Sequence, residues 1–107
     1  MDLRVTTRGV HDTAELRDHA AARVTATLSR FAERVQDVLV LLEDVTGPEK
    51  HSIDKRCRID VHLRHGATLT IDELGPEIEA SLAVALDRLK ATLSRKIGRV
   101  KRGVGAG

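Results

Sequence analysis

The sequence predicts one domain of the α+β class, built as a four-stranded mixed sheet with two helices on one face, in the order β-α-β-β-β-α. Three segments alternate apolar and polar residues with the period of two that strands show. One short apolar run predicts a fourth strand, and two longer segments repeat apolar residues every three or four positions, as amphipathic helices do. A chain of 107 residues has room for one such domain, which we place over residues 1–102, with a flexible tail over 103–107.

The first strand covers Asp2 to Arg8 and ends at Gly9. Asp12 and Glu15 lie three positions apart, which predicts a capping box at the start of the first helix. This helix is expected to run from about Thr13 to Glu33. Its apolar stripe contains Leu16, Ala20, Val24, Leu28, Phe31 and Val35.

The middle of the chain contains the other three strands. The apolar run from Val38 to Leu42 predicts a strand inside the sheet that is covered on both faces. A polar loop follows from Gly47 to Ser52, and His65-Gly66 predicts a tight hairpin turn between the last two strands. The third strand has Cys57, Ile59, Val61 and Leu63 on one side, and the fourth has Ala67, Leu69 and Ile71.

The last helix is expected to begin at Gly75-Pro76, with proline at its first helical position. Its end is expected to fray near Gly98, because glycine costs about 1 kcal/mol relative to alanine inside a helix. Its apolar stripe contains Ile78, Leu82, Leu86, Leu89, Leu93, Ile97 and Val100.

These elements define one topology. A right-handed crossover through the first helix makes the first two strands parallel, and hairpins make the remaining strands antiparallel. Both helices then bury their apolar stripes on one face of the sheet. The other face is expected to be open and to carry Arg4, Arg8, Arg56, Arg58 and Arg64.

The charge is unevenly distributed, although the formal net charge is only +2. Acidic and basic residues balance over residues 1–70. Residues 71–87 contain five acidic residues and no basic one, whereas residues 88–102 contain seven basic residues and no acidic one. Such an asymmetry predicts a polyanionic partner.

The last helix concentrates this basic charge on one side. Arg88, Arg95, Arg99 and Arg102 fall within about 60° of one another on a helical wheel, roughly 130° from the apolar stripe. The helix dipole favours cations only in the last turn, whereas this tract spans about four turns. The first helix adds a similar row at Arg23, Arg30 and Arg34.

Several kinds of site are not supported. Cys57, His62 and His65 are the closest set of metal-ligand types, but their strand parity differs and no zinc motif is present, so we predict no metal site. Ser52 has a histidine and an aspartate nearby, but no Gly-x-Ser-x-Gly elbow surrounds it. No nucleotide-binding glycine motif occurs. We therefore predict that the chain is not an enzyme and needs no cofactor.

Composition narrows the function further. Phe31 is the one aromatic residue, which argues against binding RNA bases on an aromatic sheet. The single cysteine excludes an internal disulfide and fits a reducing compartment. No signal peptide and no apolar run long enough to span a membrane is present. We expect a cytoplasmic protein with no membrane partner.

The order of five short segments resembles the ribosome hibernation-promoting factor and ribosome-associated inhibitor family, in a short, divergent form. The resemblance covers nearly the whole chain up to about Arg102, and it depends on the order and spacing of the segments together. They are TRGVH at Thr7 to His11, ELR at Glu15 to Arg17, LSRF at Leu28 to Phe31, VLVLL at Val38 to Leu42, and DRLKATLSRK at Asp87 to Lys96.

This resemblance implies a non-enzymatic factor that inactivates or protects the small ribosomal subunit in stress or stationary phase. Family members occupy the channel for messenger and transfer RNA, and they contact ribosomal RNA mainly through basic side chains. The small subunit and its ribosomal RNA would be the partners, with no small-molecule substrate. Together with the basic rows above, the resemblance gives these candidate RNA-binding residues: Arg88, Arg95, Lys96, Arg99, Arg102, Arg23, Arg30 and Arg34.

Two alternatives remain. One is a generic binder of double-stranded RNA, since such domains share an α-β-β-β-α core. The other is a protein-interaction module that uses the open sheet face, where Leu39 and Leu41 would form an apolar patch and could pair two copies as a weak homodimer.

Overall fold

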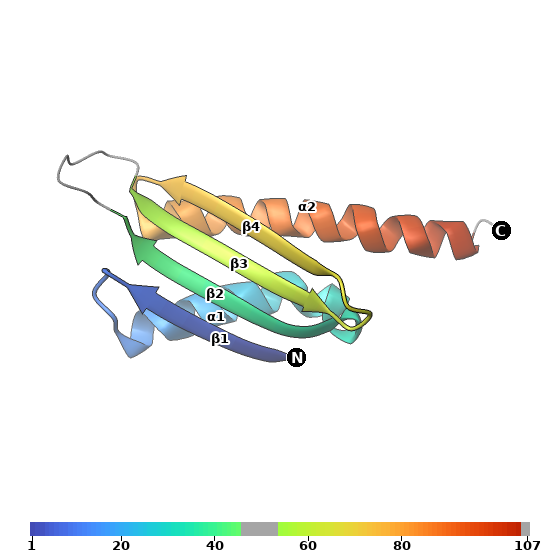
Figure 1. The fold of residues 1–107 in the computed structure, drawn as a ribbon, viewed down its shortest axis with the longest axis horizontal. Helices are drawn as coiled ribbons and strands as arrows, with labels where there is room; N and C mark the ends of the chain where they lie inside the picture. Colours follow the sequence, from blue (N-terminus) through green and yellow to red (C-terminus); the bar gives the residue numbers. More distant parts are fainter. Residues whose placement is uncertain (46–53, 106–107) are drawn as a thin grey trace.

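The computed structural model describes residues 1–45 and 54–105, with side chains as far as Ile97. It confirms the predicted order of elements and the α+β class (Figure 1). The polar loop expected from Gly47 to Ser52 lies outside the described residues. The elements are β1 (Asp2–Arg8), α1 (Ala14–Leu28), the 3₁₀ helix η1 (Ser29–Arg34), β2 (Val35–Asp44), β3 (Lys55–Leu63), β4 (Thr68–Gly75) and α2 (Ile78–Gly105).

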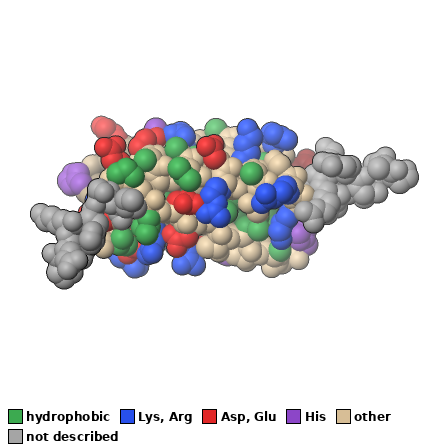
Figure 2. Space-filling model, turned by 90° about the horizontal axis from the view of Figure 1, so that it is seen from above, with side chains coloured by type: hydrophobic (Ala, Val, Ile, Leu, Met, Phe, Trp, Pro, Cys, Tyr) green, Lys and Arg blue, Asp and Glu red, His purple; other side chains and the backbone are tan. Residues whose placement is uncertain are grey.

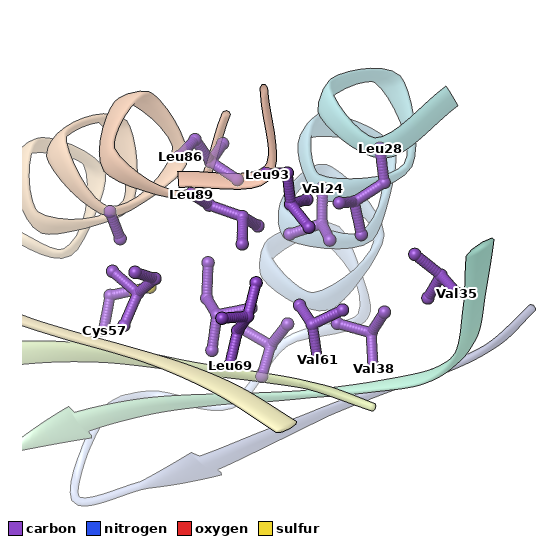
Figure 3. Packing of buried hydrophobic residues seen from close by; sticks show 14 of the residues in the cluster. Val24, Leu28, Val35, Val38, Cys57, Val61, Leu69, Leu86, Leu89 and Leu93 are labelled. Atoms are coloured by element: carbon purple, nitrogen blue, oxygen red, sulfur yellow. The ribbon is translucent and has the colours of Figure 1, made fainter. Parts of the chain in front are cut away.

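The four strands form one mixed sheet in the order β1-β2-β3-β4. β1 is parallel to β2, while β2–β3 and β3–β4 are antiparallel pairs, as the expected crossover and hairpins require. Both helices cover the same face of the sheet (Figures 1 and 3). No helix in the described part of the chain is both long and apolar enough to cross a membrane.

The hydrophobic core lies between this covered face and the two helices. Cys57, Ile59 and Val61 of β3 are completely buried, as their shared parity predicted. They face the apolar stripe of α2, in which Leu89 and Leu93 are also completely buried (Figure 3). Burying one such leucine stabilises the fold by about 1.5–3 kcal/mol.

β2 lies inside the sheet, as predicted, but it is not covered on both faces. Val38, Val40 and Leu42 are buried under the helices, whereas Leu39 is 43% exposed and Leu41 is half-buried. The expectation of two covered faces was wrong because both helices pack on one side. A continuous apolar run therefore does not require two covered faces.

The first helix differs from its prediction at both ends. Its N-cap is Thr13 and not Asp12, because the backbone N–H of Leu16 donates to Thr13 Oγ1 at 3.0 Å. Asp12 pairs with Arg17 instead. The α-helix also ends at Leu28 rather than near Glu33, and the tighter η1 continues the chain to β2.

The last helix begins later than predicted. Glu77 accepts the first helical hydrogen bond, from the backbone N–H of Ser81 at 3.0 Å, so Pro76 precedes the cap instead of occupying the first helical position. The helix continues past Gly98 to Gly105. A flexible tail over 103–107 stays a prediction, since residues 106–107 lie outside the described range.

Ser81 fastens the start of α2 to the sheet. It is 1% exposed, and its Oγ donates to the carbonyl oxygen of Lys55 on β3 at 2.6 Å. Gly75, which ends β4, lies so close that a Cβ on it would be 2.7 Å from that Oγ. A methyl group on residue 75 would therefore force the serine hydroxyl, and its hydrogen bond to Lys55, to shift.

Candidate nucleic-acid interface

The open sheet face carries many charges, but they compensate one another. Arg8 and Arg56 both contact the carboxylate of Glu43, at 3.4 and 3.1 Å. Arg58 lies 3.4 Å from Asp60, which also accepts a hydrogen bond from Thr70 at 2.6 Å. This face is therefore a mixed surface of ion pairs rather than a concentrated cationic one.

The strand register explains this compensation. On the open face, Glu43 lies across from both Arg8 and Arg56, and Asp72 lies across from Arg58. Asp60 follows Arg58 two positions later on β3 and therefore lies on the same face. Arg64, which we expected on this face, follows the end of β3 and lies in the turn to β4. A weak homodimer through the open face stays a prediction.

Two of the candidate RNA-binding residues are paired within the chain. Arg23 Nη1 lies 2.6 Å from one oxygen of Glu79, and His19 Nε2 lies 2.8 Å from the other, which links α1 to α2. Arg88 pairs with Glu73 of β4. Each carboxylate partly neutralises the charge of its arginine. Surface pairs of this kind stabilise the fold by only about 0–1 kcal/mol.

Four other candidates have no ion pair with any described residue. Arg30 and Arg34 are exposed on η1, and Arg95 and Lys96 are exposed on α2. The guanidinium of Arg30 lies over the Phe31 ring, 5.4 Å from its centroid, and this contact limits the freedom of the side chain. The side chains of Arg99 and Arg102 lie outside the described residues, and their role stays a prediction.

The turn between β3 and β4 adds two residues that we had not proposed. The backbone N–H of Arg64 donates to the carbonyl oxygen of Arg34 at 3.0 Å, which holds the turn against η1. The predicted tight turn at His65-Gly66 is confirmed, with Gly66 at φ +98°. The pairing of Val35, which follows η1, with Leu63, which precedes the turn, places Arg64 and His65 near η1. No pattern in the sequence indicated this pairing.

We call the resulting surface the cationic end. Figure 2 shows Lys and Arg side chains gathered toward the end of the molecule that carries the C-terminal residues, with most acidic side chains of this view lying away from it. The members of the cationic end are Arg30, Arg34, Arg64, His65, Arg95 and Lys96.

The candidate metal ligands Cys57, His62 and His65 are not brought together. Cys57 faces the core, where burial raises the pKa of its thiol to about 12 and keeps it protonated. His62 pairs with Asp37 on the open face, and His65 lies in the turn. Among the residues that the structure describes, no group of three metal-ligand side chains could hold an ion. Ser52 lies outside the described residues.

Comparisons with known proteins agree with this fold. The profile of one family, described as Sigma 54 modulation protein / S30EA ribosomal protein, matches residues 3–101. The N-terminal domain of Protein Y from Thermus thermophilus is 22% identical, with a TM-score of 0.69, over 89% of this chain and 98% of that chain. A ribosomal subunit interface protein from Coxiella burnetii is 16% identical, with a TM-score of 0.69, over 92% and 99%. No curated protein sequence matches the chain.

Proposed function

Because this chain belongs to the Sigma 54 modulation protein / S30EA ribosomal protein family, we propose that it binds the small ribosomal subunit and silences it by occupancy, without catalysing a reaction. The resemblance of its segments to ribosome hibernation factors supports this proposal. So does the likeness in fold to a ribosomal subunit interface protein. A factor of this kind works in the cytoplasm, where ribosomes are.

The cationic end is the observation that carries the proposal. Arg30, Arg34, Arg95 and Lys96 have no ion pair among the described residues, so their charge is available to an external partner. Arginine binds phosphate oxygens through two parallel hydrogen bonds, and lysine binds them as a compact charge. Ribosomal RNA supplies phosphates at regular spacing, and helical elements hold the cations in fixed rows against them.

Occupancy of the channel for messenger and transfer RNA is the mechanism we propose. A protein bound there excludes both ligands, so it needs no catalytic group. Preloading small subunits with messenger RNA and initiator transfer RNA should then prevent inhibition of cell-free translation. Inhibition that persists on fully preloaded subunits would move the site outside the channel.

Co-sedimentation with purified small subunits tests the binding surface. The triple variant Arg30→Gln/Arg34→Gln/Lys96→Gln removes three charges from the cationic end, and Arg4→Gln/Arg8→Gln/Arg58→Gln removes three from the open sheet face as a matched control. Each phosphate contact that is lost should reduce the slope of log K against log salt by about 0.9, so the first variant should lose about two to three units of slope. The control should bind as the wild type does. Equal losses in both variants would contradict an interface at the cationic end.

A further inference from the structure

A groove crosses the cationic end between η1, the β3–β4 turn and α2. It consists of two adjoining cavities of about 390 and 480 Å³, and Arg34 and Ile97 line both of them. The first is completed by Leu63, His65 and Lys96. The second is completed by Ser29, Arg30, Ala32 and Glu33.

The first cavity combines an apolar wall with a charged rim. Ile97 is half-buried and presents hydrocarbon surface to the space, whereas Leu63, which is 3% exposed, contributes only the small uncovered part of its side chain. Arg34 and Lys96 line the same space, and side chains of this kind combine an aliphatic stem with a charged end. Such a cavity suits a ligand with a planar, weakly polar ring system that is flanked by two anionic groups.

We propose that this groove holds one unstacked nucleotide of a single-stranded RNA segment, with its base against Leu63 and Ile97 and its flanking phosphates on Lys96 and Arg30. This inference rests on the proposed function and specifies which feature of RNA the cationic end recognises. Unstacked bases are bound by aromatic rings or by the planes of arginine guanidinium groups. The one phenylalanine is buried, so the planar groups that line the first cavity, the guanidinium of Arg34 and the imidazole of His65, are the ones that can stack on the base.

Charge favours RNA over other occupants of the groove. Arg30, Arg34 and Lys96 line the two cavities, and among the described lining residues Glu33 is the one carboxylate. A duplex would offer phosphates but would keep its bases stacked inside, so the apolar wall would stay empty. An acidic peptide would satisfy the charge but has no flat body for the cavity.

The full chain with methyl-labelled Ile and Leu, followed by NMR, provides the test. One probe is hexauridylate and the other is an abasic hexamer with the same number of phosphates. Hexauridylate should shift the methyl signals of Leu63 and Ile97 and should bind about tenfold more tightly than the abasic hexamer. Equal affinity for the two hexamers, or unchanged methyl signals, would overturn the inference.

Ile97→Ala removes the more exposed part of the apolar wall, and Val84→Ala on the exposed side of the same helix is the matched control. The first variant should lose the preference for hexauridylate over the abasic hexamer, whereas the control should keep it. A preference that survives Ile97→Ala would count against the groove. If hexaglutamate shifts the Leu63 and Ile97 signals as strongly as hexauridylate does, the groove binds an acidic protein segment and not RNA.

Co-sedimentation of wild type with small subunits separates this inference from the proposed function. Wild-type binding to subunits together with equal affinity for the two hexamers would reject the nucleotide groove and keep the function. Discrimination between the hexamers without any binding to subunits would reject the function and keep the groove as an RNA site.

Discussion

Gly75 and Ser81 lie against each other where β4 leads into α2, and a methyl group at residue 75 has no space. Gly75→Ala should therefore reduce the free energy of unfolding by about 1–3 kcal/mol, despite the lower entropy of its unfolded chain. For a domain of this size, thermal denaturation should show a decrease in Tm of roughly 5–15 °C.

A double-mutant cycle identifies the contact that is responsible. Ser81→Ala alone removes the hydroxyl that bonds to the Lys55 carbonyl oxygen, which should cost about 1 kcal/mol. In Gly75→Ala/Ser81→Ala the methyl group at position 75 no longer meets the serine hydroxyl, which it would otherwise approach to 2.7 Å. The combined loss should therefore be smaller than the sum. Additive losses would mean that the alanine at position 75 is strained by some other contact.

Cys57 should be chemically inert in the folded protein. Burial raises its pKa from 9.0 to about 12, so the thiol stays protonated when folded, while in the unfolded chain it ionises near pH 9. Its contribution to stability is intact below pH 9 and is lost as the pH rises from about 9 toward 12. Iodoacetamide at pH 8.5 should react slowly with native protein and rapidly in guanidinium chloride. Equal rates in the two conditions would contradict the burial.

At the level of single elements, two neighbouring residues at the start of α1 have different roles in stability. Thr13 accepts a hydrogen bond from the backbone of Leu16, whereas the side chain of Asp12 contacts Arg17 on the surface. Thr13→Ala should therefore reduce the free energy of unfolding by about 1 kcal/mol, as loss of an N-cap does. Asp12→Ala should change it by no more than about 0.5 kcal/mol. Urea denaturation of both variants measures the difference, and the opposite ranking would restore Asp12 as the cap.

The strands were predictable because one face of each is buried. A period of two then fixes which side chains point inward, and Cys57, Ile59 and Val61 follow that rule. The helix ends were harder to predict, because several polar residues near each end can cap. The change from α1 to η1 was missed because Phe31 stays buried in either helical form, so the apolar stripe contains no signal for it.

At the level of the whole molecule, the basic residues in the predicted rows are not the same residues as the basic residues of the cationic end. Arg23 is paired with Glu79, 56 positions away, and Arg88 is paired with Glu73 of β4. No periodicity within one helix reveals such partners. Arg64 and His65 join the surface because a hairpin turn brings them to η1. The sequence thus predicted that the interface is basic. Which residues belong to it depends on contacts between elements, which the sequence did not reveal.

The pairing of β1 with β2 also determines the order in which the fold can be completed. Asp2 pairs with Asp37, 35 positions away, whereas Leu63 and Ala67 are joined by a three-residue turn. Closing a longer loop costs more entropy, so β3 and β4 should acquire protected amides first and β1 last. Pulsed hydrogen exchange during refolding measures this order, and simultaneous protection of β1 and β4 would contradict it. During synthesis the strand that emerges first must therefore wait, unpaired, until β2 has been made.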